Sequence, residues 1–163
     1  MAEDAVGGIA VVHYREGYRY QLTKAHEQDV SVDGIFPVKP GGNEFVHLSL
    51  GGDLYIAKHY AWNGADRPAI NDKMFVRPSL VHDAHIQLWH LKIIDDAGRA
   101  AADRLLGRML RIDALIIARR QKLLPRLLIT AVAYVRPLWV EGFVSWYSKH
   151  YAVIQEEPIL TAP

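Results

Sequence analysis

"SLVHDAHIQLWHL", residues 79–91, marks the point at which the pattern of the chain changes. Before Ser79 apolar residues alternate with polar ones between turn signals, whereas from Ser79 onward they recur at helical intervals. Ser79 follows Pro78 and is suited to cap a first helix over residues 80–91. We therefore expect an α+β fold, in which a sheet comes first and helices pack on one of its faces.

The first 60 residues predict a small antiparallel β-meander. Short β-branched and aromatic runs form two pairs, at residues 9–14 and 18–22 and at residues 44–50 and 53–60. Gly51-Gly52, between the members of the second pair, is a strong hairpin signal. The stretch "FPVKPGGN", residues 36–43, is rich in proline and glycine and predicts a loop between the two pairs.

Three segments make up the helical half. Asp95 and Asp96 are placed to cap the second segment, and a third apolar segment runs from residue 123 to residue 147. Its longest uncharged run, "LLITAVAYV", is far shorter than the roughly 20 residues that a membrane span requires. Because charged residues and Pro137 interrupt it further, we expect buried helices rather than a membrane span.

Composition excludes several classes of protein and site. The 163 residues fit one domain over 1–163, mainly β over 1–60 and mainly α over 79–150. Nineteen Lys and Arg against 18 Asp and Glu leave a formal charge of +1, which by itself favours neither nucleic acid nor membrane. Without cysteine there is no disulfide framework, thiolate zinc site or cysteine nucleophile. The absence of cysteine also fits a reducing cytoplasm or a virion assembled in one, and the acidic N-terminal stretch does not fit a signal peptide.

His82 and Asp83 are candidate site residues. Neighbours on a helix point about 100° apart, so these two side chains cannot form a tight pair with each other. His82 could instead act as a general base while Asp83 holds a divalent cation, and Asp103 on an antiparallel second helix could orient the imidazole. Calcium suits such a site, with carbonyl ligands from the loop that contains Asn63 and Gly64.

A purely structural interpretation of the same residues stays open. An ion pair between Asp83 and Arg99 would fasten the helices without any catalysis. On this interpretation no cofactor is expected. His85 and His90 are expected to be partly exposed helix residues in either case.

Basic residues recur along the second helical segment. If residues 104–126 formed one helix, these side chains would fall within a stripe about 80° wide: Arg104, Arg108, Arg111, Arg119, Lys122 and Arg126. The stripe could bind phosphate on nucleic acid or on anionic lipid headgroups. The alternative is a solvated outer face opposite apolar residues that pack inward, namely Leu105, Met109, Ile112 and Ile116.

Three stretches in this order resemble the DUF1353 family of phage and bacterial proteins. They are "YAWNGADRPAI" (60–70), "MFVRPSLVHDAHIQL" (74–88) and "RAAADRLLGRML" (99–110). The matching positions are Trp62 and Gly64, His82 and Asp83, and Arg99, Ala102 and Asp103. The resemblance covers residues 60–110 and implies a phage-encoded protein.

The same pattern is similar, more distantly, to the His-Asp helix of phospholipases. That similarity implies His82 as the base, Asp83 as a calcium ligand and Asp103 as the support of the histidine. This chain departs from the pattern at Ile86, where a tyrosine is usual, and it keeps only Gly64 of the glycine-rich calcium loop.

Three functions therefore remain at this point. The first is a structural or accessory protein of a phage particle, at the tail or head surface, that contacts other virion proteins or itself. The second is a calcium-dependent, phospholipase-like ester hydrolase. The third is a membrane-surface or nucleic-acid binder that uses the basic stripe. We rank the structural protein first because the usual tyrosine is replaced by Ile86.

Overall fold

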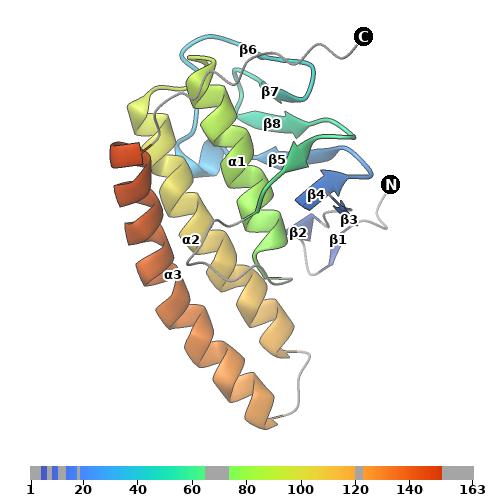
Figure 1. Ribbon diagram of the computed structural model, residues 1–163, viewed down its shortest axis with the longest axis vertical. Coiled ribbons are helices and arrows are strands. Elements are labelled where there is room, and N and C mark those ends of the chain that lie inside the picture. Colours follow the sequence, from blue (N-terminus) through green and yellow to red (C-terminus); the bar gives the residue numbers. More distant parts are fainter. Residues whose placement is uncertain are drawn as a thin grey trace.

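The computed structural model describes residues 5–6, 9–10, 14–17, 19–64, 74–119 and 123–151. It has an α+β fold, as expected, with antiparallel strands followed by three helices (Figure 1). The helices are α1 (Val76–His90), α2 (Asp96–Arg119) and α3 (Leu123–Tyr151). The strands are β1 (Ala5–Val6), β2 (Ile9–Ala10), β3 (Tyr14–Gly17), β4 (Arg19–Leu22), β5 (His26–Asp29), β6 (Gly41–Gly42), β7 (Val46–Leu48), β8 (Asp53–Ile56) and β9 (Ala61–Trp62).

The largest sheet has the strand order β5-β8-β7-β6 and is antiparallel throughout. In its register Val46 lies opposite Ile56 and Leu48 opposite Leu54, and all four side chains are buried. Because side chains alternate across a strand, these residues form one continuous apolar face. A second sheet, β3-β4-β9, and the pair β1-β2 complete the strand half.

The predicted hairpin at Gly51-Gly52 is confirmed by the β7–β8 pairing. Gly52 has φ of 89° and lies so close to Ser31 that a Cβ atom would come within 2.7 Å of the Ser31 Cβ, so only glycine fits. Strand β5 was not predicted, because its sequence "HEQD" is polar. The predicted loop at 36–43 contains the short strand β6, which pairs with β7.

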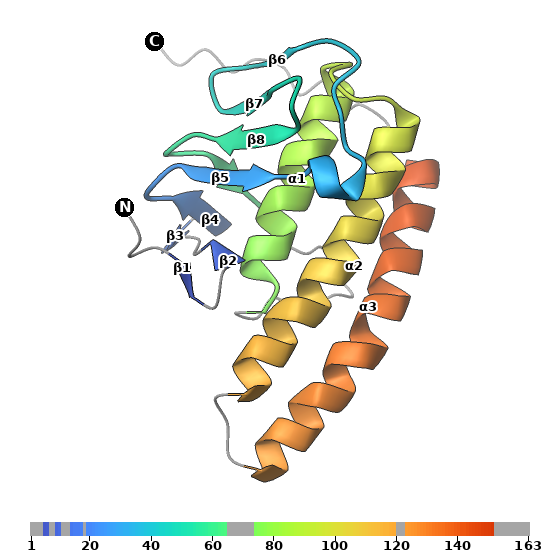
Figure 2. The same cartoon turned by 180° about the vertical axis from the view of Figure 1, so that it is seen from behind.

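The helices form two layers on the sheet. Residues of α1 and α2 join the sheet residues in one buried cluster, whereas α3 packs along α2 (Figures 1 and 2). The ends of α2 and α3 nearest Arg119 and Leu123 extend past α1 and the strands (Figure 1). A smaller cluster of Phe75, Leu106, Leu110 and Val140 links α3 to this core.

The start of α1 differs from the prediction. The helix begins at Val76, and Ser79 lies inside its first turn rather than at its cap. The Ser79 hydroxyl donates to the carbonyl of Val76 and accepts the Trp62 Nε1–H, each at 3.1 Å, and so joins β9 to α1. The predicted cap of the second helix is confirmed, because Asp95 accepts the backbone N–H of Gly98 at 2.8 Å.

The later helices differ in two respects from what the sequence suggested. Residues 104–126 do not form one helix, because α2 ends at Arg119 and α3 begins at Leu123. The third segment is one helix with Pro137 inside it, and many of its apolar side chains are exposed rather than buried. Within the described residues, no helix meets the length and hydrophobicity that crossing a membrane demands.

Candidate functional site

His82 and Asp103 meet between α1 and α2, as expected. The Nε2 atom of His82 lies 2.9 Å from Asp103 Oδ1, although the two residues are 21 positions apart. The antiparallel course of α1 and α2 brings them together (Figure 1). Asp103 is almost completely buried, and the His82 side chain is 11% exposed.

Arg99 completes this group. Its guanidinium donates to Asp103 Oδ2 at 3.0 Å, one turn of α2 away, and lies 5.7 Å from the centre of the Trp89 ring. The indole N–H of Trp89 in turn donates to Asp96 at 2.8 Å. Arg99 thus pairs with Asp103, whereas the structural interpretation of the sequence had paired it with Asp83. We call His82, Asp103 and Arg99 the α1–α2 polar cluster.

The environment of His82 favours its protonated form. Burial alone would lower the pKa of His82, but the hydrogen bond to Asp103 and the negative charges of Asp83 and Asp103 outweigh it and raise that pKa to about 9. At neutral pH the imidazole is thus a cation that donates to Asp103. A cationic imidazole has no lone pair for a proton, so it is poorly suited to act as a general base.

Asp83 lies on the other side of the imidazole. Its Oδ1 atom is 3.8 Å from His82 Nδ1, longer than a hydrogen bond, as the helical geometry predicts. The Asp83 side chain is 31% exposed and borders a pocket of about 500 Å³. His82 does not line this pocket.

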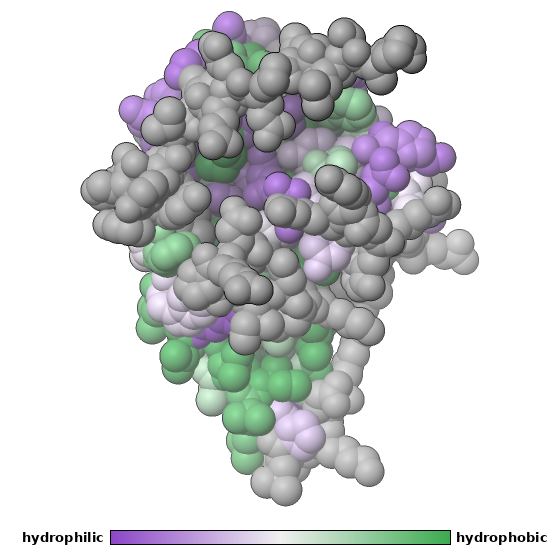
Figure 3. Space-filling model, in the orientation of Figure 1, coloured by the Kyte–Doolittle hydropathy of each residue, from purple (hydrophilic) through white to green (hydrophobic). Residues whose placement is uncertain are grey.

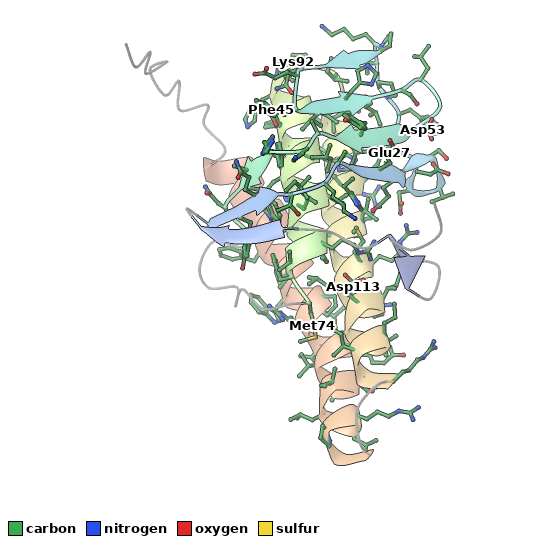
Figure 4. The ribbon with its side chains drawn as sticks, turned by 90° about the vertical axis from the view of Figure 1, so that its right-hand side faces the viewer. Glu27, Phe45, Asp53, Met74, Lys92 and Asp113 are labelled. Atoms are coloured by element: carbon green, nitrogen blue, oxygen red, sulfur yellow. The ribbon has the colours of Figure 1, made fainter. Side chains whose placement is uncertain are left out.

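The pocket lies between α1 and the segment from β7 to β9. Its lining residues are Phe45, His59, Tyr60, Ala61, Asp83, Ile86, Gln87 and His90. Phe45, labelled in Figure 4, lies toward the Lys92 end of the molecule, where α1 ends. Sequence reasoning missed most of this lining, because its members come from separate elements and share no spacing.

Several lining residues have unusual local environments. Burial, and then the charge of Asp83, raise the pKa of Tyr60. His59 has a positive φ of 75°, which is uncommon for a residue other than glycine. Gln87 Oε1 is buried and has no hydrogen-bond partner among the described residues. Ile86, where the resemblance implies a tyrosine, also lines the pocket.

The expected calcium ligands are not assembled around this pocket. Asp83 lines it, but Asn63 is exposed and neither Asn63 nor Gly64 is part of the lining. Among the residues that the structure describes, no group of three or more His, Asp or Glu side chains is placed to hold a metal ion. Calcium normally takes six to eight oxygen ligands, and Asp83 is the one carboxylate among the described residues that line the pocket.

His85 differs from its expected exposure. It is fully buried, and its Nδ1 donates to the Val81 carbonyl at 2.6 Å. Burial lowers the pKa of His85 to about 4, and burial likewise lowers that of His26 on β5 to about 4. Both imidazoles are therefore neutral near pH 7. His90 is partly exposed, as expected.

The basic stripe is divided between two helices. Arg108 pairs with Asp33, and the Arg111 guanidinium lies 5.7 Å from the centre of the Tyr134 ring on α3. Arg104, Arg119 and Arg126 are exposed, and Lys122 lies outside the described residues. Leu105 and Met109 pack inward as expected, but Ile112 is exposed, contrary to expectation.

Asp113, the acidic residue within the basic segment, forms an ion pair with a residue of α1. It accepts two hydrogen bonds from Arg77 of α1, at 3.1 and 2.5 Å. Burial raises the pKa of Asp113, against the lowering effect of Arg77. This ion pair joins α1 to α2 nearer the start of α1 than the polar cluster does (Figure 4).

The outer side of α3 exposes an apolar surface. Seven large apolar side chains there are 37 to 69% exposed: Leu127, Leu128, Val132, Tyr134, Val135, Leu138 and Trp139. Together with exposed Ala131 they form what we call the apolar α3 face. The side toward α2 has the smaller residues Ala133, Pro137 and Val140. Apolar atoms also gather on the view in Figure 3, over the part of α2 and α3 that extends past the sheet.

Comparisons with protein-family models, with curated protein sequences and with solved structures found no match to this chain. The resemblance to DUF1353 stays a prediction.

Proposed function

We propose that this chain is a structural or accessory protein that acts through protein–protein contacts, and that the apolar α3 face makes those contacts. The observation that supports the proposal is the size of this face. Its exposed fractions correspond to about four whole side chains, on the order of 800 Å². The largest apolar patch of an ordinary monomer is about 300–600 Å², and larger patches mark interaction sites.

The α1–α2 polar cluster also supports a structural role for this chain. Its histidine is cationic at neutral pH, its aspartate is buried and both aspartate oxygens are bonded. Such a group fixes how two helices pack, which is a structural task. The resemblance noted in the sequence suggests a phage particle as the setting, with virion proteins at the tail or head surface as partners.

Photo-crosslinking tests the proposal directly. The photoreactive residue p-benzoylphenylalanine is introduced at Leu138, on the apolar α3 face, and at Leu50 as a control of matched exposure on the β7–β8 turn. We expect a cross-link from position 138 to a protein identified by mass spectrometry as a second copy or a particle component. The control should give none. Absence of any protein cross-link at position 138 would remove the proposal.

A second candidate, calcium-dependent ester hydrolysis, is favoured by one observation, the pocket beside Asp83. In that function Asp83 would bind calcium and His82 would serve as the base. Hydrolysis of a panel of lipid and small esters, measured with calcium and with chelator, tests it. Calcium-dependent turnover that disappears in His82→Ala would support the hydrolase, and no turnover on any ester would exclude it.

A further inference from the structure

We infer that the apolar α3 face binds the same face of a second copy of this chain, with the two α3 helices antiparallel about a two-fold axis level with Ala133. This inference rests on the proposed function, because it names the partner of the surface described there. A two-fold interface requires a surface that complements itself.

The apolar α3 face has that property. Each exposed position has an apolar counterpart at the same distance on the other side of Ala133, which itself points toward the protein interior and is 1% exposed. The counterpart positions are 127 and 139, 128 and 138, 131 and 135, and 132 and 134. An antiparallel pair centred at this level would therefore place every apolar residue of the face level with another apolar residue of the second copy.

The middle of the face has the spacing of a helix-pairing seam. Leu128, Ala131, Val135 and Leu138 follow intervals of three, four and three residues and span about 80° of the helix. This is the a/d spacing of paired helices, in which side chains of one helix fit between those of the other. A lipid surface requires no such register.

The sizes of the side chains also complement each other. In the antiparallel arrangement Leu128 lies opposite Leu138 of the second copy, and Ala131 lies opposite Val135 of the second copy. The smaller pair is nearest the axis, where the helix backbones approach most closely. The larger leucines then fill the space on either side.

The area and the charge of this face are those of a specific interface. A specific interface buries about 800 Å² on each partner, which equals the approximate exposed area of this face. Residues 125–140 contain no acidic residue and two arginines, Arg126 and Arg136. Arg136 is directed to the Phe75 ring, 5.3 Å from its centre. The middle of the seam therefore has no charge that dimer formation would desolvate.

Light scattering on the full chain gives the first test. We expect a dimer at about 50 μM, well above a micromolar dissociation constant. Val135→Glu should weaken the dimer at least tenfold, because it puts a carboxylate into the seam. Leu50→Glu, at a similarly exposed site outside the face, should leave the dimer unchanged. Circular dichroism checks that both variants stay folded.

Engineered disulfides test the direction of pairing, and the natural chain has no cysteine to interfere. The antiparallel pair brings residue 128 beside residue 138 of the second copy. Two residues 128 would lie about 15 Å apart along the axis, beyond disulfide reach. Mixing Leu128→Cys with Leu138→Cys should therefore give a mixed disulfide on oxidation, while each variant alone should give at least tenfold less cross-linked product.

Each other outcome overturns the inference. Efficient disulfides within each single variant would indicate parallel helices. A monomer that floats with anionic lipid vesicles would make the face a membrane surface. A monomer whose position 138 cross-links only to a different protein would exclude the second copy while the proposed function stands. A monomer without any cross-link would exclude both.

Discussion

The α1–α2 polar cluster and the apolar α3 face reverse the usual distribution of side chains. Between α1 and α2, buried Asp103 and Arg99 contact each other and the nearly buried His82 contacts Asp103, whereas on α3 seven large apolar side chains face outward. Buried charge pairs fix one helix geometry, because any displacement leaves a charge unpaired. The chain thus fixes the packing of α1 against α2 with polar contacts and leaves a large apolar area exposed on α3.

Removal of the Asp103 carboxylate from the α1–α2 polar cluster should cause the largest loss of stability. Asp103→Ala leaves the His82 imidazolium and the Arg99 guanidinium buried without their shared counter-charge. We expect a loss of roughly 3–5 kcal/mol in the free energy of unfolding, measured in urea at pH 7. Asp53→Ala, at an exposed β8 carboxylate, is the control. A loss below about 1 kcal/mol would mean that the cluster does not hold α1 and α2 together.

The contribution of His82 to the free energy of unfolding should be visible in the pH dependence of stability. Its pKa in the folded chain, about 9, lies above the unfolded value of 6.5, so its contribution is complete below pH 6.5 and disappears as the pH rises toward 9. We expect an alkaline loss on the order of 2–3 kcal/mol that His82→Gln abolishes, as measured by urea unfolding from pH 5 to pH 10.

The acid side of the same profile provides an internal control. His26 and His85 have folded pKa values near 4, below the unfolded value, so stability falls as the pH drops from 6.5 toward 4. This acid loss should persist in His82→Gln. A variant profile with both losses intact would contradict the assigned protonation of His82.

The Arg77–Asp113 pair should give a smaller effect than the cluster, since both side chains are 14% exposed. Arg77→Met leaves a largely buried carboxylate without its partner, and we expect a loss of about 2 kcal/mol at pH 7. The loss should shrink at low pH, because protonation removes the unpaired charge of Asp113. An equal loss in Asp113→Asn at every pH would instead indicate a packing effect.

The smallest effect on folding should come from the apolar α3 face. Leu138→Ser should change the stability of the monomer by less than about 0.5 kcal/mol, because the side chain is already exposed. Leu106→Ala, toward the interior on α2, should cost about 2–5 kcal/mol. Both are measured at submicromolar concentration, where dimerisation does not contribute. A large loss in Leu138→Ser would mean that the face is packed within one chain.

Some parts of the fold and of the site could be predicted from the sequence, because they depend on local chemistry or on short connections. The Gly51-Gly52 hairpin and the Asp95 cap depend on local chemistry, which a sequence displays directly. The meeting of His82 and Asp103 followed from two helices joined by a short connection, which must run antiparallel.

Other parts depend on tertiary contacts that leave no local pattern. Strand β5 is polar and forms because β8 offers it a hydrogen-bonding edge. His85 was expected to be partly exposed, because its sequence position does not show that tertiary packing buries it completely. The exposure of α3 could not be predicted, because an apolar segment predicts burial whether or not the rest of the chain covers it.

The link between Asp33 and Arg108 has a consequence for how this chain is made. These residues are 75 positions apart, and Gln28 contacts Met109 across 81 positions. Because the ribosome releases the strands before α2, the inner face of the β5–β8–β7 sheet leaves the tunnel uncovered. Contacts between such distant residues form slowly. During synthesis the apolar face of the strand half is therefore exposed until α1 and α2 cover it, which favours aggregation at that stage.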